Sequence, residues 1–284
     1  MEKLQKIFLT IGIILLVLIP VWRFLIVPEL ETLSADFSRR FNFYYALNEL
    51  QDLEGGWLGE QLANGFVEDK TINVDGNTQV IESWFKAESL EGDLLWETKN
   101  KFSINRKTRE NIKRNEESVA GSYFLFPQKA EKKSYKVWPM GYNHNFDMQF
   151  KGVENIKGLE VYHFGYEDAI TDDTDDYGWL ELVPDTYNVG SIQGTEYWIE
   201  PVTGIIINLD DEGTSFYKDK TTGEKVQDFY IWKIKFKDDT IANQVRIAQN
   251  KKQQIILYEI IIPVLLAVIV VALFFAAYIG RKKQ

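Results

Sequence analysis

Two long stretches of apolar residues lie near the two ends of the chain. In residues 7–27, IFLTIGIILLVLIPVWRFLIV, only Arg23 is charged, and in residues 255–279, IILYEIIIPVLLAVIVVALFFAAYI, only Glu259 is charged. A helix needs about 20 such residues to cross the hydrocarbon core of a bilayer. The pattern therefore predicts two transmembrane helices, which divide the chain into five parts: residues 1–6, 7–27, 28–254, 255–279 and 280–284.

The first apolar stretch has an alternative interpretation as a cleaved signal peptide. Such a peptide ends at a cleavage site of small residues, whereas this chain continues as RFLIVPELETL. The sequence therefore favours an uncleaved anchor, in which Arg23 extends toward the outer interface.

Basic residues flank both predicted spans on the side of the chain ends. Lys3 and Lys6 precede the first span, and a cluster from Arg281 to Lys283 follows the second. By the positive-inside rule both termini lie in the cytoplasm, and the central domain of this cell-membrane protein is extracytoplasmic. Arg39, Arg40, Lys251 and Lys252 lie on the proposed outer side and argue the other way, but a domain of this length is translocated largely regardless of its charge.

Short β-prone runs separated by turn residues fill the region between the spans. TINV and NTQVIESWF flank Asp75-Gly76, a strong hairpin signal. A further strand is predicted at GDLLWETKNKFSI. Three more hairpins are predicted: MQFKGVE with LEVYHFGY, joined at 155–158; EYWIE with IIINL, joined at 201–204; and TSFYKD with VQDFYIWKIKF, joined at 221–223. The pattern predicts a mainly β fold, an antiparallel sheet arranged as a sandwich or a barrel, with the two flanking transmembrane helices.

Two segments next to the spans are predicted to be helical. After Asp239 no helix-breaking residue occurs before Pro263, so one helix is expected to continue into the second span. On the N-terminal side, ADFSRRFNFYYALNELQDL (residues 35–53) has helical length and polarity. Its aromatic residues are expected to pack in the core of the domain rather than among lipid headgroups.

Composition excludes several classes of function. The formal net charge is -10, and an acidic surface argues against binding to nucleic acid. The absence of cysteine excludes disulfides and thiolate chemistry. About 220 residues lie between the spans, which suffices for a hydrophobic core.

Candidate chemical sites are few. The acidic segment DAITDDTDDYGW contains Asp173, Asp175 and Asp176, which are weak candidates for a metal site, but the twelfth position of a calcium loop is Pro184 instead of a glutamate. The two histidines, His144 and His163, are interpreted as structural or surface residues. No nucleophile, zinc-protease, phosphate-loop or dinucleotide motif is found, so no catalytic residue and no cofactor are predicted.

Small residues recur every four positions in the second span, at Ala272, Ala276 and Gly280. This spacing lets membrane helices approach closely. It is compatible with a homo-oligomer formed through the transmembrane helices, although alanine is common in such helices.

The order of several short motifs resembles the PorA-type family of two-pass bacterial envelope proteins. The motifs are FLIVPELETL (24–33), Phe126-Pro127 followed by EKKSY (131–135) and Trp138, GLEVYHF (158–164), and YWIEP (197–201) leading to Thr203-Gly204. The chain departs from the family at 105–108, Asn-Arg-Lys-Thr, where an Asp-Arg pair before a threonine is usual. The family name implies a porin, but two apolar helices cannot form a wide pore within one chain.

The function expected from these observations is non-enzymatic: a membrane-anchored domain that binds or passes an apolar ligand, such as a lipid or another cell-envelope component. One alternative is an oligomeric, porin-like channel. A second is a cell-wall hydrolase that uses a pair of carboxylates, whose spacing is spatial and cannot be read from one sequence.

Overall fold

The computed structural model describes residues 2–50, 56–112, 121–142, 144–177 and 184–282. They form two units. One consists of residues 1–34 together with 249–284, and the other of residues 35–248.

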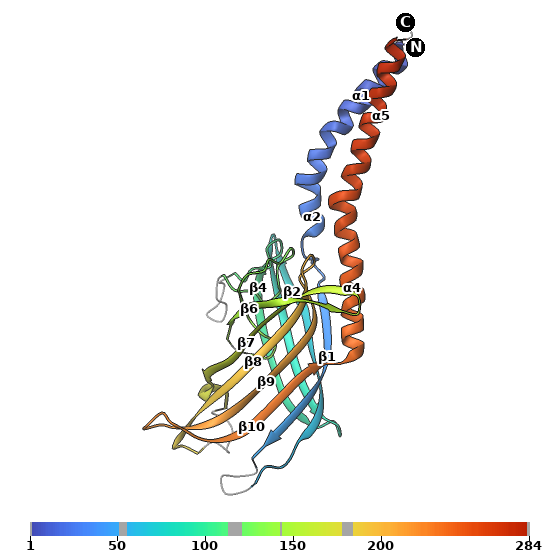
Figure 1. Ribbon diagram of the computed structural model, residues 1–284. Coiled ribbons are helices and arrows are strands. Elements are labelled where there is room, and N and C mark those ends of the chain that lie inside the picture. The colour runs from blue at the N-terminus through green and yellow to red at the C-terminus, as the bar shows by residue number, and fades with distance from the viewer. Residues whose placement is uncertain (1, 51–55, 113–120, 143, 178–183, 283–284) are drawn as a thin grey trace. The chain divides into compact units, whose positions relative to one another are not determined.

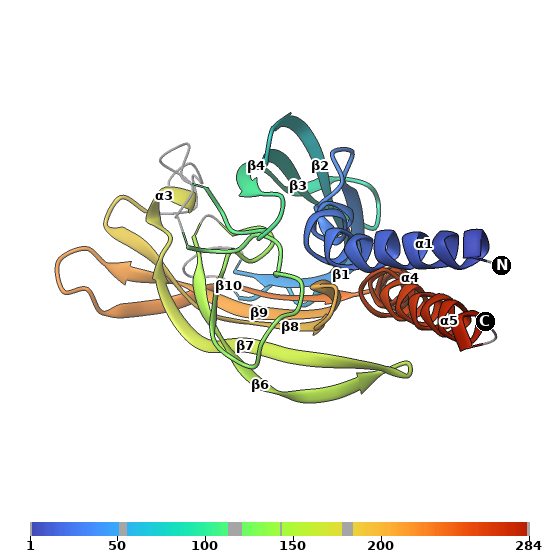
Figure 2. The same ribbon diagram turned by 90° about the horizontal axis from the view of Figure 1, so that it is seen from above.

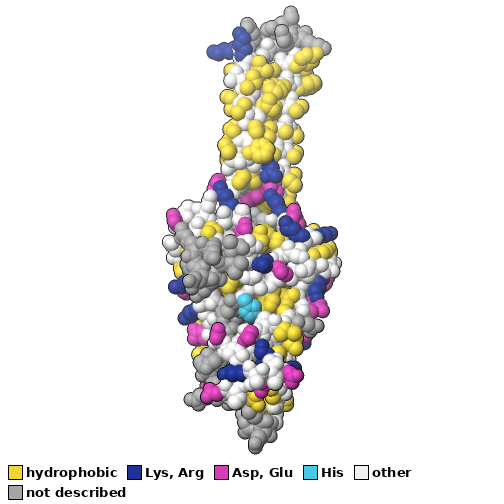
Figure 3. Space-filling model, turned by 90° about the vertical axis from the view of Figure 1, so that its left-hand side faces the viewer, with side chains coloured by type: hydrophobic (Ala, Val, Ile, Leu, Met, Phe, Trp, Pro, Cys, Tyr) yellow, Lys and Arg dark blue, Asp and Glu magenta, His cyan; other side chains and the backbone are white. Residues whose placement is uncertain are grey.

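The helical unit contains both apolar stretches. Helix α1 (Glu2–Val21), the π-helical turn η1 (Trp22–Ile26) and helix α2 (Val27–Glu31) follow one another without a break, as do α4 (Asp238–Ile256), η2 (Leu257–Ile261) and α5 (Ile262–Lys282). Both helices are long and apolar enough to cross a membrane, and hydrophobic side chains cover most of their surface in Figure 3. The structure thus confirms two long apolar helices, and also that α4 continues into the second apolar stretch.

Each π-helical turn precedes a proline. In a regular α-helix the rings of Pro28 and Pro263 would clash with the carbonyl groups four residues earlier, which belong to Phe24 in η1 and Glu259 in η2. Bonds between residues five apart replace the normal ladder, for example from the N–H of Val27 to the carbonyl of Trp22. The proline positions therefore account for both irregular turns.

Within this unit α1 and α5 lie side by side (Figure 1). Gly12 lies against Phe274 so closely that an added Cβ would come within 2.6 Å of the ring. A second contact joins the two π-helical turns, where Arg23 forms an ion pair of 2.9 Å with Glu259. The only charged residues of the two predicted spans thus neutralise each other.

Within its described residues, the β unit is built on one sheet of ten antiparallel strands. In sequence order these are β1 (Ser38–Glu49), β2 (Gln61–Asp75), β3 (Thr78–Ser89), β4 (Leu94–Asn105), β5 (Tyr135–Val137), β6 (Phe146–Ile156), β7 (Leu159–Asp172), β8 (Tyr187–Glu200), β9 (Ile205–Asp219) and β10 (Lys225–Phe236), with a short helix α3 (Thr174–Tyr177) after β7. Their order across the sheet is β4-β3-β2-β1-β10-β9-β8-β7-β6-β5. Figures 1 and 2 show that the sheet curls into a half-barrel.

The concave face of the half-barrel holds the main core. Alternate residues of the strands point inward, as in β3, where buried and half-exposed positions follow each other along nearly the whole strand. The segment 121–142 lies across this face and adds Phe126, Tyr135 and Met140 to the same cluster of buried residues. One sheet therefore buries its inner face under a connection of its own chain.

Glycines opposite aromatic residues allow side chains to lie flat on the concave face. Phe43 pairs with Gly65, and Trp232 pairs with Gly213, on neighbouring strands. A Cβ at Gly65 would lie 2.1 Å from the Phe43 ring, and one at Gly213 would lie 2.2 Å from the Trp232 indole. In these pairs the aromatic ring packs directly against the backbone of the neighbouring strand.

The first turns of α4 pack on the convex face. Val245 and Ala248 are buried against Val161 of β7 and Ile207 of β9. Near the start of the helix the hydroxyl of Thr240 donates to the carbonyl of Asn42, 2.9 Å away. The C-terminal helix therefore begins as part of the β unit.

The predicted hairpins are confirmed, because their turns are determined by local sequence. Asp75 pairs with Thr78 around Gly76, whose φ is +57°. The connections at 157–158, 201–204 and 220–224 join the strands that were expected there. The mainly antiparallel β fold is confirmed as a half-barrel instead of a two-sheet sandwich.

The helix predicted at residues 35–53 is wrong. Residues Ser38–Glu49 form β1, in which Phe41, Phe43, Tyr45 and Leu47 are buried and the residues between them are partly or fully exposed. This period of two places one row of side chains in the core, and the burial outweighs the helical composition. Of the five aromatic residues in this segment, Phe41, Phe43 and Tyr45 do pack in the core, as expected.

Candidate functional site

A cavity of about 220 Å³ opens on the concave face of the half-barrel. Eight aromatic residues line it, namely Tyr45, Phe85, Trp96, Tyr142, Tyr217, Phe229, Tyr230 and Trp232. The rings of Tyr217 and Phe229 stack with centroids 4.4 Å apart. Such a wall offers a large apolar contact area to a ligand.

Strand alternation places these side chains on one face. On β10, Tyr230, Trp232 and Ile234 line the cavity, and in the adjacent strand β1 Tyr45 and Leu47 lie opposite Ile234 and Trp232. Because side chains two residues apart share a face of a strand, the two strands together form the floor of the cavity.

A buried carboxyl group forms the polar centre of the cavity. Asp211 of β9 is only 3% exposed. Its Oδ1 accepts a hydrogen bond from the indole N–H of Trp232 at 2.9 Å, its Oδ2 accepts one from the hydroxyl of Tyr142 at 2.8 Å, and the hydroxyl of Thr195 also donates to Oδ2. Burial raises the pKa of Asp211 to about 6, although these three donors act in the opposite direction. The group therefore exchanges a proton near neutral pH within a largely apolar wall.

A loop next to the cavity is fixed by hydrogen bonds. The indole N–H of Trp138 donates to the carbonyl of Tyr142 at 2.6 Å, and the backbone N–H of Met140 donates to the hydroxyl of Tyr197 at 3.0 Å. Burial, followed by the charge of Asp211, raises the pKa of Tyr142 well above its ordinary value, so its hydroxyl keeps its proton and acts as a donor. The bond from Tyr142 to Asp211 thus ties this loop to the sheet.

Two further carboxylates line the same cavity. Asp173 follows β7 and is 8% exposed, and Glu49 ends β1. The backbone N–H of Asp173 donates to the carbonyl of Val189 at 3.0 Å, whereas its buried Oδ1 has no hydrogen-bond partner within the described part of the chain. The described wall contains no lysine and no arginine, and His144 is its one basic residue.

The structure places two of the three acidic residues proposed for a metal, Asp173 and Asp175, in different surroundings. Asp173 lines the cavity, Asp175 is exposed in α3, and the side chain of Asp176 lies outside the described residues. Among the side chains that are described, no group of three His, Cys, Asp or Glu residues could hold a metal ion.

The two histidines lie in different environments. His163 stacks on Trp198 with ring centroids 4.5 Å apart, and its Nδ1 lies 3.0 Å from a carboxylate oxygen of Glu154. His144 lies in the cavity wall, with its Nε2 3.4 Å from the amide nitrogen of Gln193. Only His144 is placed to contact a ligand of the cavity.

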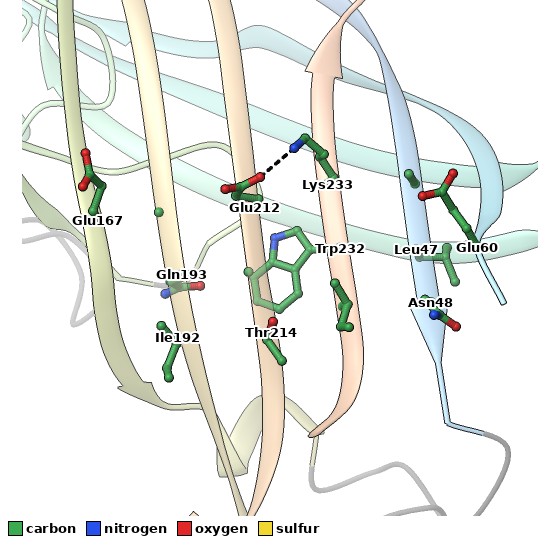
Figure 4. A pocket seen from close by; sticks show the side chains of 14 residues that line it. Leu47, Asn48, Glu60, Glu167, Ile192, Gln193, Glu212, Thr214, Trp232 and Lys233 are labelled. Carbon is green, nitrogen blue, oxygen red and sulfur yellow. Dashed lines mark hydrogen bonds and ion pairs between the residues drawn. The ribbon is translucent and has the colours of Figure 1, made fainter. Parts of the chain in front are cut away.

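A second pocket, of about 480 Å³, lies mainly on the opposite face of the same strands (Figure 4). Its charged residues include Glu167, Glu212 and Lys233, all of them exposed, and Lys233 forms an ion pair of 2.8 Å with Glu212. This pocket is larger, but its side chains are mostly those of a solvated sheet surface. The concave cavity, with its aromatic wall and buried carboxyl groups, is therefore the candidate site.

Two of the three small residues, Ala272 and Ala276, lie outside the contact between α1 and α5. Ala272 and Ala276 are exposed on α5, whereas Phe274 faces Gly12, and the surroundings of Gly280 lie outside the described residues. Packing of these residues against another copy of the chain stays a prediction.

Sequence reasoning found Asp173 but missed Asp211, Tyr142 and Trp232. Asp211 is the second of two adjacent aspartates, and a strand of known register would place one of them inside. Tyr142 reaches the cavity through a long connection, for which the sequence carries no local signal.

The sequence model of a protein family described as Porin PorA matches residues 6–279. No curated protein matches the chain significantly.

Solved structures resemble the chain only distantly. A DUF1329 family protein from Desulfovibrio piger is 11% identical, with 75% of this chain and 88% of that chain covered and a TM-score of 0.20. The peroxisomal multifunctional enzyme type 2 from Drosophila melanogaster is 13% identical, with 77% and 40% covered and a TM-score of 0.16. The 12:0-ACP thioesterase from Umbellularia californica is 14% identical, with 71% and 74% covered and a TM-score of 0.15. These low scores give no information about activity.

Proposed function

The chain belongs to the porin PorA family, and from that premise we propose that it is a membrane-anchored, non-enzymatic domain that binds or passes an apolar ligand in the cavity of its half-barrel. The ligand would be a lipid or another component of the cell envelope. The observation that carries this proposal is the aromatic cavity on the concave face.

The size of the cavity supports the binding of a small ligand or of one part of a larger one. Its volume of about 220 Å³ lies just below the range of about 300–1,000 Å³ that is common for small-molecule sites. Aromatic walls with a few polar groups are typical of such sites, because apolar contact supplies affinity and the polar groups fix orientation.

We further propose that both termini are cytoplasmic and that the half-barrel lies outside the cell. The basic residues Lys3 and Lys6 before the first apolar helix, and those after the second, support this orientation. A half-barrel outside the membrane would meet envelope lipids or wall components directly.

Native mass spectrometry of the full-length protein, released from lipid nanodiscs, tests the binding. Leu95 lines the cavity, whereas its neighbour Leu94 lies opposite Glu88 and does not line it. We expect wild type to carry an apolar molecule at about one copy per chain. Leu95→Trp should lose that molecule, and Leu94→Trp should retain it.

Binding in this cavity would be contradicted if wild type carried no bound molecule. It would also be contradicted if both tryptophan variants retained the molecule equally.

A channel formed by several copies is a second candidate function. The description of the family as a porin and the exposure of Ala272 and Ala276 on α5 favour it. The pairing of Arg23 with Glu259 disfavours it, because this pairing leaves the apolar helices without a free charge to line a pore. The channel would be supported if the wild-type protein conducts ions in planar bilayers and Ala272→Leu does not. It would be excluded if the wild-type protein shows no conductance at high protein density.

A further inference from the structure

We propose that the ligand of the concave cavity carries a positively charged nitrogen, so that the site selects amphiphiles with an amine or quaternary ammonium group over those with a carboxylate or phosphate. This inference rests on the proposed function, because it names the class of ligand that the same cavity would take.

The charges of the wall are the first argument. Glu49, Asp173 and Asp211 contribute carboxyl groups, and His144 is the one basic residue among the described residues of the wall. An anionic head group would lose its hydration and gain no lysine or arginine in return, next to charges of its own sign. A cationic group would meet opposite charges instead.

Asp173 provides the second argument. Its side chain lines the cavity and is more than nine-tenths buried, yet Oδ1 accepts no hydrogen bond from any described residue. Asp211 differs, because three donors already occupy its two oxygens. A buried carboxylate oxygen without a donor is costly. A protonated amine that reaches Asp173 would donate the missing bond, and a quaternary ammonium group would offset its negative charge, without disturbing the bonds of Asp211.

The aromatic wall provides the third argument. Trp96, Phe229 and Tyr230 line the cavity. Aromatic side chains of this kind can contact an alkyl chain, and their negative π surfaces also attract a cation. A bare metal ion fits less well, since the described residues contain no group of three metal-ligating side chains. An organic cation with an apolar body uses both the rings and the carboxylates.

The test uses full-length protein in nanodiscs of zwitterionic phosphatidylcholine, titrated calorimetrically with three six-carbon probes after subtraction of empty nanodiscs. The probes are hexyltrimethylammonium, hexanol and hexanoate, which share a chain and differ in charge. We expect hexyltrimethylammonium to bind most tightly and hexanoate most weakly. Asp173→Asn should weaken the binding of hexyltrimethylammonium about tenfold, because the attraction between opposite charges is lost, and it should leave the binding of hexanol unchanged.

Asp175→Asn is the matched control, because it removes the same charge from an exposed position of α3 outside the cavity. It should bind all three probes as wild type does. Equal affinity for hexanoate and hexyltrimethylammonium, or unchanged affinity of Asp173→Asn for the cation, would overturn the preference for a positive charge. Hexanol binding in that case would leave the proposed function intact, whereas failure of all three probes to bind wild type would contradict both proposals.

Discussion

Replacing Asp211 with asparagine should change how the stability of the protein depends on pH. In the folded protein burial raises the pKa of this carboxyl group from 3.8 to about 6. An acid whose pKa is raised by folding holds its proton more tightly in the folded state than in the unfolded state. Its contribution to stability is therefore fully present below the unfolded pKa, and it is lost as the pH rises through about 6.

The size of the effect follows from the shift. A difference of about two pKa units corresponds to about 3 kcal/mol between the fully protonated and fully ionised limits. When the pH falls from 8 to 5, the free energy of unfolding of wild type should rise relative to that of Asp211→Asn by roughly half of this amount, about 1.4 kcal/mol. For a protein of this size that difference moves Tm by about 3–6 °C.

Thermal melts of full-length protein in nanodiscs, followed by near-ultraviolet circular dichroism from pH 5 to pH 8, measure this difference. Glu212→Gln is the control, because Glu212 is exposed next to Asp211 and pairs with Lys233 on the other face of the sheet. The Tm of wild type relative to Asp211→Asn should rise as the pH falls. A difference that stays constant over this range, or one that Glu212→Gln reproduces, would refute the assignment of a raised pKa to Asp211.

Three further predictions concern packing and charge. Gly213→Val should destabilise the fold by about 2–3 kcal/mol, because the valine side chain would overlap the indole ring of Trp232. Thermal melts should show no such loss of stability for Gly152→Ala, where the space is open. Glu259→Gln should lower the Tm, because it leaves Arg23 without its carboxylate partner, and replacing both residues with leucine should restore the Tm. An unchanged Tm in Glu259→Gln would show that the ion pair adds nothing to stability. Asp173→Asn should melt at or above the wild-type temperature, because it removes a buried charge whose Oδ1 accepts no hydrogen bond from a described donor. A large decrease in Tm would instead show that the Asp173 side chain has a structural partner.

Local signals explain why most of the sheet could be predicted. A turn such as Asp75-Gly76 depends on the residues at the turn itself, since glycine adopts the required positive φ. The two apolar helices were equally evident, because length and hydropathy are properties of one segment. Strand β1 was missed because residues 35–53 have the length and composition of a helix, and only the alternation from Phe41 to Leu47 indicates a strand.

The candidate site depended on contacts between distant segments and was therefore harder to predict. Asp210 and Asp211 are adjacent in sequence, yet one pairs with Lys235 on the outer face and the other is buried. The strand register decides between them, and the register follows from the whole sheet. Tyr142 completes the site from a connection that crosses the concave face, so the cavity exists only after the chain has folded.

The most direct test of ligand binding in the half-barrel is photolabelling of the full-length protein in nanodiscs with an alkyl alcohol that carries a diazirine. We expect peptide mapping to place the label on cavity residues such as Trp96 and Tyr230. Leu95→Trp should remove this label, and Leu94→Trp should retain it. Labelling confined to the two apolar helices, with none on the concave face, would contradict ligand binding in the half-barrel.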